Sequence, residues 1–339
     1  MSAARNFLIG AIVLFGGIGV AAWVKKGKIV TQSSAPQQIV EIAVNPTPIT
    51  PPLKKEEKVI MPAPTKIASA KQEVVEPTVE DFPVVDRIGR LFALDSSKFP
   101  IVETVSFTSR VPWLKGRPAW VADYASYYET SRHFIARSLN KKADYFSQKV
   151  SPGDRFNVFR KDKPVQFHLL IDLSKCRMLF YYIDLDLGER VLLKSYRVGV
   201  GRLDPSRASG YLTPIGKYSI GDKVAIYKTD TTGFFENQKI EMIRVFGTRW
   251  IPFDKELENC TEEAKGFGLH GVPWINDANT GLLIEDKNKL GKYDSDGCIR
   301  LSSEDIEELF AIVLTKPTIV ELVKEFRDAK LPGVEKNFP

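Results

Sequence analysis

The stretch SDGCIRLSSEDIEELF, residues 295–310, joins a glycine–cysteine pair to the start of a helix. Apolar residues recur at helical spacing over 302–313, and Ser302 or Ser303 precedes acidic residues, as at a helix N-terminus. Cys298 stands four or five residues ahead of that start. A cysteine attacks as its thiolate, which a nearby base or a helix N-terminus favours. The stretch therefore suggests a nucleophile, although a lone cysteine is more often a buried, inert side chain.

Candidates for the base are few, because the chain has only three histidines. His270 ends the apolar run GFGLHGV, in which Gly268 and Gly271 would let the backbone approach a ligand closely. His168 lies in the middle of a predicted strand, and His133 lies on the apolar side of a predicted helix. We expect both to be packing residues, which leaves His270 as the partner of Cys298.

The residues upstream of Cys298 have a β pattern. The short alternating or apolar runs VQFHLLIDL, RMLFYYIDL, LLKSYRVGVG and GKYSIGD follow one another from residue 165 and are separated by turn residues. Helical periodicity returns only at 302–313. The pattern predicts a mainly β domain with one late helix over residues 164–325, followed by a C-terminal tail, 326–339.

A different pattern precedes this domain. It predicts a strand, two short helices and a second strand, with Thr130 or Ser131 as the N-cap of the second helix; the ranges are 102–108, 118–128, 131–139 and 149–159. The runs ADYASYYETSRHFIARSLN and VSPGDRFNV resemble the LysM-like modules found beside cell-wall enzymes, although WLKGRP replaces their usual opening turn. Residues 81–163 are therefore interpreted as a small α+β LysM-like module.

Composition narrows the class of protein. A chain of 339 residues with 43% hydrophobic and 27% charged residues is neither wholly disordered nor a polytopic membrane protein. Residues 86–163 carry fifteen Lys/Arg against eight Asp/Glu, which indicates either an anionic partner or an ordinary solvated surface. Three cysteines exclude a disulfide scaffold and a zinc ribbon. Cys176 and Cys260 could pair in an oxidising compartment or remain separate thiols.

The N-terminus predicts a membrane segment. Residues 7–24 are uncharged, and as a helix they would span about 27 Å, enough for a thin bilayer core. We favour an uncleaved anchor within residues 1–30 over a signal peptide cut near Ala21 or Ala22. Residues 31–80 hold eight prolines and no glycine, which is typical of an extended spacer. Lysines that follow the span would by themselves place the protein body in the cytoplasm.

Six runs, taken in order, resemble the L,D-transpeptidase catalytic domain of the YkuD family: IDLSKCRMLFYY, YRVGVGRLD, YLTPIGKYSI, VFGTRWIPF, GFGLHGV and SDGCIRLSSEDIEELF. The resemblance covers about residues 164–324, and the ordered combination of T-P-x-G, H-G and S-x-G-C-I-R is what makes it specific. It implies a YkuD-type β-sandwich with a late helix, Cys298 as nucleophile and His270 as base. It also implies a domain outside the cytoplasmic membrane, which overrules the lysine-based topology.

The resemblance assigns further site residues. Gly297 and Cys298 would supply backbone oxyanion donors, while Ser295, Asp296 and Gly271 would shape the site. Arg300 would hold a substrate carboxylate, and Trp250 would bind substrate or serve as a structural residue. No metal or other cofactor is implied.

Two departures from the family pattern stand beside the nucleophile. Asp296 occupies a position where the family often has histidine, and a carboxylate there opposes thiolate formation unless Arg300 or His270 compensates. The segment 271–294 is also longer than the usual spacing, which predicts an enlarged loop beside the site.

The implied reaction is formation of 3→3 cross-links between peptidoglycan stem peptides, as part of cell-wall biogenesis and cell shape. The same cysteine could instead serve an L,D-carboxypeptidase or D-amino-acid exchange reaction, and a lapsed wall-binding protein is the alternative from another class. The expected partners are stem peptides and carbapenem inhibitors, not nucleic acid. The expected location is the cytoplasmic membrane, with the catalytic domain facing the periplasm or cell wall.

Overall fold

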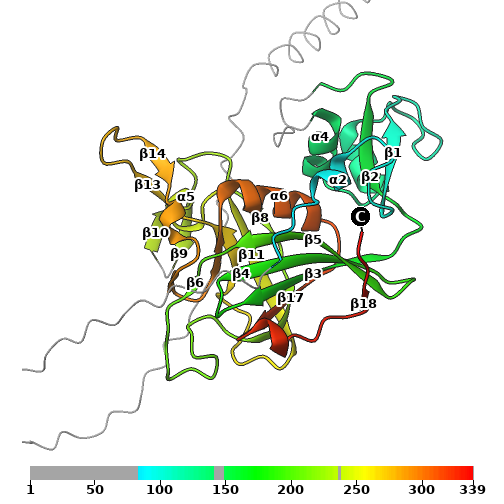
Figure 1. Cartoon of the computed structure of the whole chain (residues 1–339). Coiled ribbons are helices and arrows are strands. Elements are labelled where there is room, and N and C mark those ends of the chain that lie inside the picture. Colours follow the sequence, from blue (N-terminus) through cyan, green and yellow to red (C-terminus); the bar gives the residue numbers. More distant parts are fainter. Residues whose placement is uncertain (1–82, 141–148, 236–237, 339) are drawn as a thin grey trace, which may run out of the picture. The chain divides into compact units, whose positions relative to one another are not determined.

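The computed structural model describes residues 83–140, 149–235 and 238–338 (Figure 1). These residues fall within one unit of the chain, Ile42–Pro339. The predicted membrane segment (1–30) and the proline-rich spacer (31–80) lie outside the described residues. Within the described ranges, no helix combines the length and the apolar character needed to cross a bilayer.

Ten strands of the described chain form the main sheet. Its order is β16-β12-β11-β7-β17-β3-β4-β5-β18, and β8 pairs with β11 off this path. The pairs β12–β16, β3–β17 and β5–β18 are parallel. The bounds are β3 (Val165–Asp172), β4 (Arg177–Asp184), β5 (Glu189–Arg197), β7 (Gly216–Ile220), β8 (Val224–Ala225), β11 (Arg249–Glu258), β12 (Gly268–Gly271), β16 (Ile299–Leu301), β17 (Thr318–Val323) and β18 (Val334–Glu335). The predicted tail thus supplies an edge strand.

The central strands are buried on both faces. Along β3, Phe167, Leu169 and Ile171 join the main hydrophobic core, whereas Leu170 joins a second cluster with Leu179 of β4. This division follows from the two-residue period of a strand, which sends successive side chains to opposite faces. Nearly continuous apolar runs are expected where both faces are covered.

Helix α6 (Ser303–Val313) covers one face of the sheet (Figure 1). Ser302 caps it by accepting a hydrogen bond from the Asp305 amide at 3.1 Å, and Glu304 and Asp305 occupy its first turn. The apolar face of the helix enters the main core. The predicted mainly β domain with a late capped helix is confirmed.

Four two-stranded sheets and several short helices complete the described chain. The sheets pair β1 with β2, β6 with β15, β9 with β10, and β13 with β14. Their strands are β1 (Val102–Ser106), β2 (Arg155–Phe159), β6 (Val200–Gly201), β9 (Thr232–Phe235), β10 (Gln238–Glu241), β13 (Trp274–Asn276), β14 (Leu283–Glu285) and β15 (Tyr293–Ser295). The helices are α2 (Gly89–Phe92), α3 (Val121–Tyr127), α4 (Arg132–Asn140), α5 (Ile243–Phe246), and the 3₁₀ turns η1 (Lys287–Lys289) and η2 (Phe326–Asp328).

The segment before the main sheet has the predicted order of strand, two helices and strand. Ser131 caps α4 by accepting a hydrogen bond from the Phe134 amide at 3.0 Å, so of the two predicted caps the serine is used. Phe134 and Phe159 of this segment belong to the same core as the main sheet. Ser131 Oγ donates a hydrogen bond to the Ala311 carbonyl of α6. Phe107, Tyr124 and Phe156 form a separate cluster within the segment, so it has a small core of its own and also packs into the core of the main sheet. The LysM-like interpretation stays a prediction.

The two histidines predicted to be packing residues are buried. His133 packs its ring edge against Phe310 and bonds the Tyr227 hydroxyl through Nε2 at 2.9 Å. His168 pairs with Glu321 at 2.8 Å across β3 and β17. Both predictions are confirmed.

All three cysteines are free thiols. Cys176 is buried, and the Cys260 thiol donates to the Lys217 carbonyl at 3.0 Å. Of the two alternatives for these residues, the structure has separate thiols.

A cluster of charges ties the N-terminal segment to the sheet and to α6. Lys194 Nζ on β5 lies 2.8 Å from Glu308, 3.1 Å from Asp305 and 3.4 Å from Asp86. The side chains of Lys194, Glu308 and Asp305 are largely buried, so removal of the lysine would leave two largely buried carboxylates without their cation, next to the more exposed Asp86. Breaking a buried pair from one side costs more than its net contribution, because the remaining charges stay desolvated.

We predict that Lys194→Ala lowers the free energy of unfolding of the full-length protein by about 3 kcal/mol. Urea denaturation followed by circular dichroism measures this. The matched control is Lys336→Ala, which removes the more exposed pair with Glu189 and is expected to cost less than about 1 kcal/mol. Equal losses in the two variants would contradict the buried-cluster account.

Candidate active site

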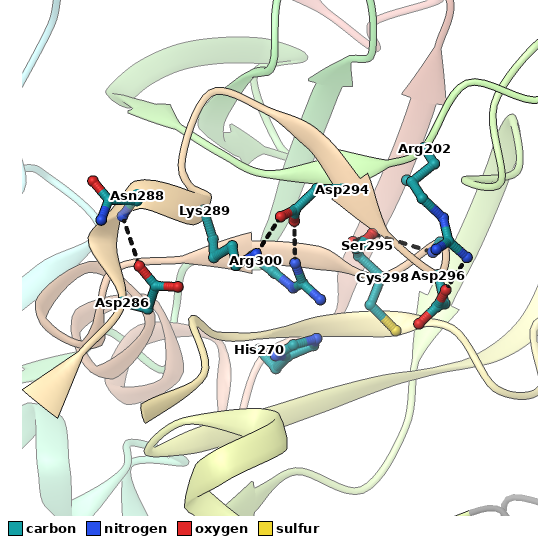
Figure 2. Close-up of polar contacts among 12 residues, drawn as sticks. Arg202, His270, Asp286, Asn288, Lys289, Asp294, Ser295, Asp296, Cys298 and Arg300 are labelled. Carbon is teal, nitrogen blue, oxygen red and sulfur yellow. Dashed lines mark hydrogen bonds and ion pairs between the residues drawn. The ribbon is translucent and has the colours of Figure 1, made fainter. Parts of the chain in front are cut away.

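The site is built on the parallel pair β12–β16. His270 lies opposite Arg300 in the register, and Leu269 lies opposite Ile299. Leu269, Ile299 and Leu301 point into the main core. Because side chains alternate along a strand, His270, Arg300 and Cys298, two residues before Arg300, share the other face. Figure 2 shows the Cys298 sulfur and the His270 imidazole projecting into the same space.

The loop that carries Cys298 is held by the Ser295 hydroxyl. Its oxygen accepts a hydrogen bond from the Gly297 amide at 3.1 Å and donates one to the Cys298 carbonyl at 2.7 Å. Gly297 has a φ of +120°, and a Cβ there would lie 2.4 Å from the Phe267 ring. Glycine is therefore the only residue that fits between Asp296 and Cys298 in this turn.

His270 is held in one tautomer. Its Nδ1 donates to the Gly271 carbonyl at 2.7 Å, because a carbonyl can only accept, and this leaves the lone pair on Nε2. The ring packs at 5.5 Å from Phe246 and 5.8 Å from Trp250, measured between centroids. Burial, with a smaller contribution from Arg300, lowers the pKa of His270 to about 3, against the opposing hydrogen bond to Gly271. The imidazole is therefore neutral at pH 7 and can accept a proton.

The Cys298 thiol is half-buried, and its sulfur lies 3.6 Å from the Gly266 carbonyl. Burial raises the pKa of Cys298 to about 12. The backbone of Gly268 and the charge of Arg300 lower this pKa, whereas the carboxylate of Asp296 raises it. The resting site thus holds a neutral thiol and a neutral imidazole rather than an ion pair.

Residues 166–322 match the model of the YkuD family, the L,D-transpeptidase catalytic domain. This part of the chain is a YkuD domain. No curated protein matches the chain.

Two solved structures resemble part of the chain. The helical cell shape determining protein Pgp2 from Campylobacter jejuni is 18% identical over 50% of each chain, with a TM-score of 0.32. Bd1075 from Bdellovibrio bacteriovorus is 14% identical over 47% of this chain and 48% of its own, with a TM-score of 0.31. The chain thus spans about half the length of each protein, and at this similarity neither carries an argument about its role.

Two predicted roles in the YkuD domain change in the structure. The Gly297 amide is not an available oxyanion donor, because it is bonded to Ser295; the glycine shapes the loop instead. Trp250 is only 3% exposed and lies opposite His270 in the β11–β12 register. Its buried ring packs against the imidazole, which agrees with the structural role among the two predicted for it. The Gly271 carbonyl accepts the hydrogen bond from His270 Nδ1.

Arg300, predicted to bind a substrate carboxylate, already has one within the protein. Its Nη1 donates to Asp294, whose other oxygen lies 2.5 Å from Lys289 Nζ. The arginine side chain is 14% exposed, and its buried Nε has no hydrogen-bond partner. Asp294 was not singled out from the sequence. In this structure Arg300 is paired with Asp294, and its positive charge lowers the pKa values of Cys298 and His270.

Asp296 is paired with a residue that sequence reasoning missed. Its carboxylate lies 2.5 Å from Nη2 of Arg202, and both side chains are exposed, at 78% and 60%. Arg202 belongs to the run YRVGVGRLD, but nothing in its local pattern links it to a residue 94 positions away. Arg202, rather than Arg300 or His270, pairs with this carboxylate.

The long segment 271–294 forms the hairpin β13–β14 and the turn η1. Trp274 and Leu283 on its inner face pack in the same cluster as Trp250 and Cys298. Trp274 Nε1 also donates to Ser303 Oγ at 3.3 Å, which joins the hairpin to the start of α6. The predicted loop beside the site is thus a hairpin that packs against the nucleophile's surroundings.

We predict that iodoacetamide alkylates Cys298 slowly at pH 7 and about tenfold faster for each added pH unit up to pH 10. The reason is that the thiolate fraction rises in this way below the pKa. In Asp296→Asn the removed negative charge lowers the pKa of Cys298, so the rate at a given pH rises about threefold. Peptide mapping by mass spectrometry measures alkylation of Cys298 separately from that of the other two thiols.

The matched control is Asp254→Asn, an exposed carboxylate on β11, which is expected to leave the rate unchanged. A plateau of the alkylation rate near pH 7 in the parent protein would contradict a neutral resting thiol.

Proposed function

We propose that this protein is a peptidoglycan L,D-transpeptidase that forms 3→3 cross-links through a thioester on Cys298. The observation that carries the proposal is the placement of Cys298 and His270 on one face of neighbouring strands, with the His270 lone pair fixed on Nε2. A nucleophile, a base and an orienting group for the base are the parts that acyl transfer to a thiol requires.

The first half-reaction forms the thioester. The Cys298 thiol passes its proton to Nε2 of His270 as the sulfur attacks the carbonyl between the third and fourth residues of a stem tetrapeptide. The carbon–nitrogen bond then breaks, and D-Ala leaves with the proton from His270. A neutral pair suits this step, because the proton moves only when the substrate carbonyl is in place. The Cys298 amide is the candidate donor to the oxyanion, since the Gly297 amide is bonded to Ser295.

The second half-reaction transfers the acyl group. The side-chain amine of a diamino acid on another stem attacks the thioester, gives a proton to His270, and the proton returns to the sulfur. Water or a D-amino acid in place of this amine would give the carboxypeptidase or exchange reaction. We place the choice of acceptor in the β13–β14 hairpin, because its Trp274 and Leu283 pack against the same cluster as Cys298.

The proposed place of action is outside the cytoplasmic membrane, with residues 1–30 as anchor and residues 31–80 as spacer. Peptidoglycan stem peptides, the proposed substrate, are found there. The basic segment 86–163 would contact the wall polymer in its LysM-like role.

The test incubates the full-length protein with a disaccharide-tetrapeptide and identifies products by mass spectrometry. We expect a cross-linked dimer and free D-Ala from the parent protein, and neither from Cys298→Ala. His270→Asn should lower the rate by at least about a hundredfold, because general-base catalysis contributes that much. A carbapenem should add its mass to Cys298 in the parent protein.

Tripeptide without dimer would replace the transpeptidase with the carboxypeptidase. If the parent protein forms neither product nor adduct but still binds sacculi, the protein is a wall-binding module with a lapsed site. Equal activity in parent and Cys298→Ala would overturn the nucleophile assignment itself.

A further inference from the structure

Arg202 is an exposed cation at the mouth of the site with most of its donors unused. Only its Nη2 is bonded within the described protein, to one oxygen of Asp296. By contrast, the Arg300 guanidinium is 14% exposed and already bonded to Asp294. Of the two arginines next to the Cys298 loop, Arg202 is the one that a ligand in solution can reach.

The backbone of Arg202 is fixed to the nucleophile loop. Its amide donates to the Ser295 carbonyl at 3.0 Å, and its carbonyl accepts from the Leu212 amide at 2.8 Å. Gly201 before it pairs with Ser295 in the β6–β15 register, and a Cβ on Gly201 would lie 3.1 Å from the Gly297 Cα. The side chain therefore extends from backbone that is hydrogen-bonded to the loop carrying Cys298.

The neighbouring Asp296 shows which chemistry fits this guanidinium. A carboxylate oxygen sits 2.5 Å from Nη2 in an exposed setting, so the pair is held loosely by solvent-screened attraction (Figure 2). A planar guanidinium binds a carboxylate best through two parallel hydrogen bonds, which the single contact with Asp296 does not use. A substrate carboxylate can thus take the remaining donors or displace Asp296.

We propose that Arg202 forms a carboxylate subsite beside Cys298 and that Asp296 holds its side chain in position until the substrate arrives. The inference rests on the proposed function, because stem peptides supply the carboxylates. Two sources share this chemistry: the terminal carboxylate of the D-Ala that leaves, and the carboxylate of the diamino acid. Arg202 is then a specificity-determining residue for the same reaction.

The experiment measures KM and kcat for release of the C-terminal residue, as D-Ala or as its amide, by the full-length protein, with three peptides. These are the tetrapeptide free acid, its C-terminal D-Ala amide, and its diamino-acid amide. We expect Arg202→Gln to raise KM for the free acid about tenfold while kcat changes less than threefold, the loss typical of one bidentate contact. The amide for which parent and Arg202→Gln have equal KM identifies the carboxylate that Arg202 binds. Arg202→Lys should recover only part of the loss.

A double variant separates binding of a substrate carboxylate by Arg202 from neutralisation of the Asp296 charge. If Arg202 only neutralises Asp296, the double variant Arg202→Gln/Asp296→Asn regains the parent KM. If Arg202 binds substrate, the double variant keeps the tenfold loss. Arg207→Gln is the matched control, since Arg207 lies on the same connection and pairs with Glu262, and we expect it to leave KM unchanged.

A binding measurement keeps the subsite testable apart from turnover. Calorimetry compares binding of the three peptides to Cys298→Ala and to Arg202→Gln/Cys298→Ala, with the same tenfold difference expected for the free acid. Absence of turnover by the parent protein would count against the proposed function, while this binding difference would still support the subsite. Equal affinities of the two variants for the free acid, or restoration of KM in the double variant, would overturn it.

Discussion

The register between β12 and β16 is the constraint on which the site depends. It places Leu269, Ile299 and Leu301 in the core, and the two-residue period of the strands then brings His270 and Cys298 to the opposite face. A slip by one residue would turn the nucleophile into the core and expose the leucines. The same register therefore buries the apolar side chains and places Cys298 and His270 on the opposite face.

Two ion pairs flank Cys298 and His270. Arg300 with Asp294 lies next to His270 in the register, and Arg202 with Asp296 lies at the exposed end of the loop. The thiol and the imidazole between them are neutral, because burial shifts their pKa values in opposite directions. The site is therefore an uncharged thiol and imidazole flanked by two ion pairs.

The local features of this architecture were predictable from sequence, and the long-range pairings were not. The Ser302 cap, the late helix and the β runs each depend on residues within a few positions of one another. Cys298 and His270 could be matched because the chain offers few candidates and the motifs occur in the family's order. The partner of Asp296 is 94 residues distant and has no motif, so only the folded backbone brings Arg202 to it. The burial of Trp250 likewise depends on which face of β11 the fold covers.

The core that the N-terminal segment shares with the main sheet has a consequence for the evolution of the protein. Phe134 and Phe159 of the N-terminal segment pack in one core with Phe167 of the main sheet. Neither segment can be exchanged for a module from another protein without repacking aromatic side chains on both sides. A substitution at one of these contact positions in one segment therefore calls for a compensating substitution in the other.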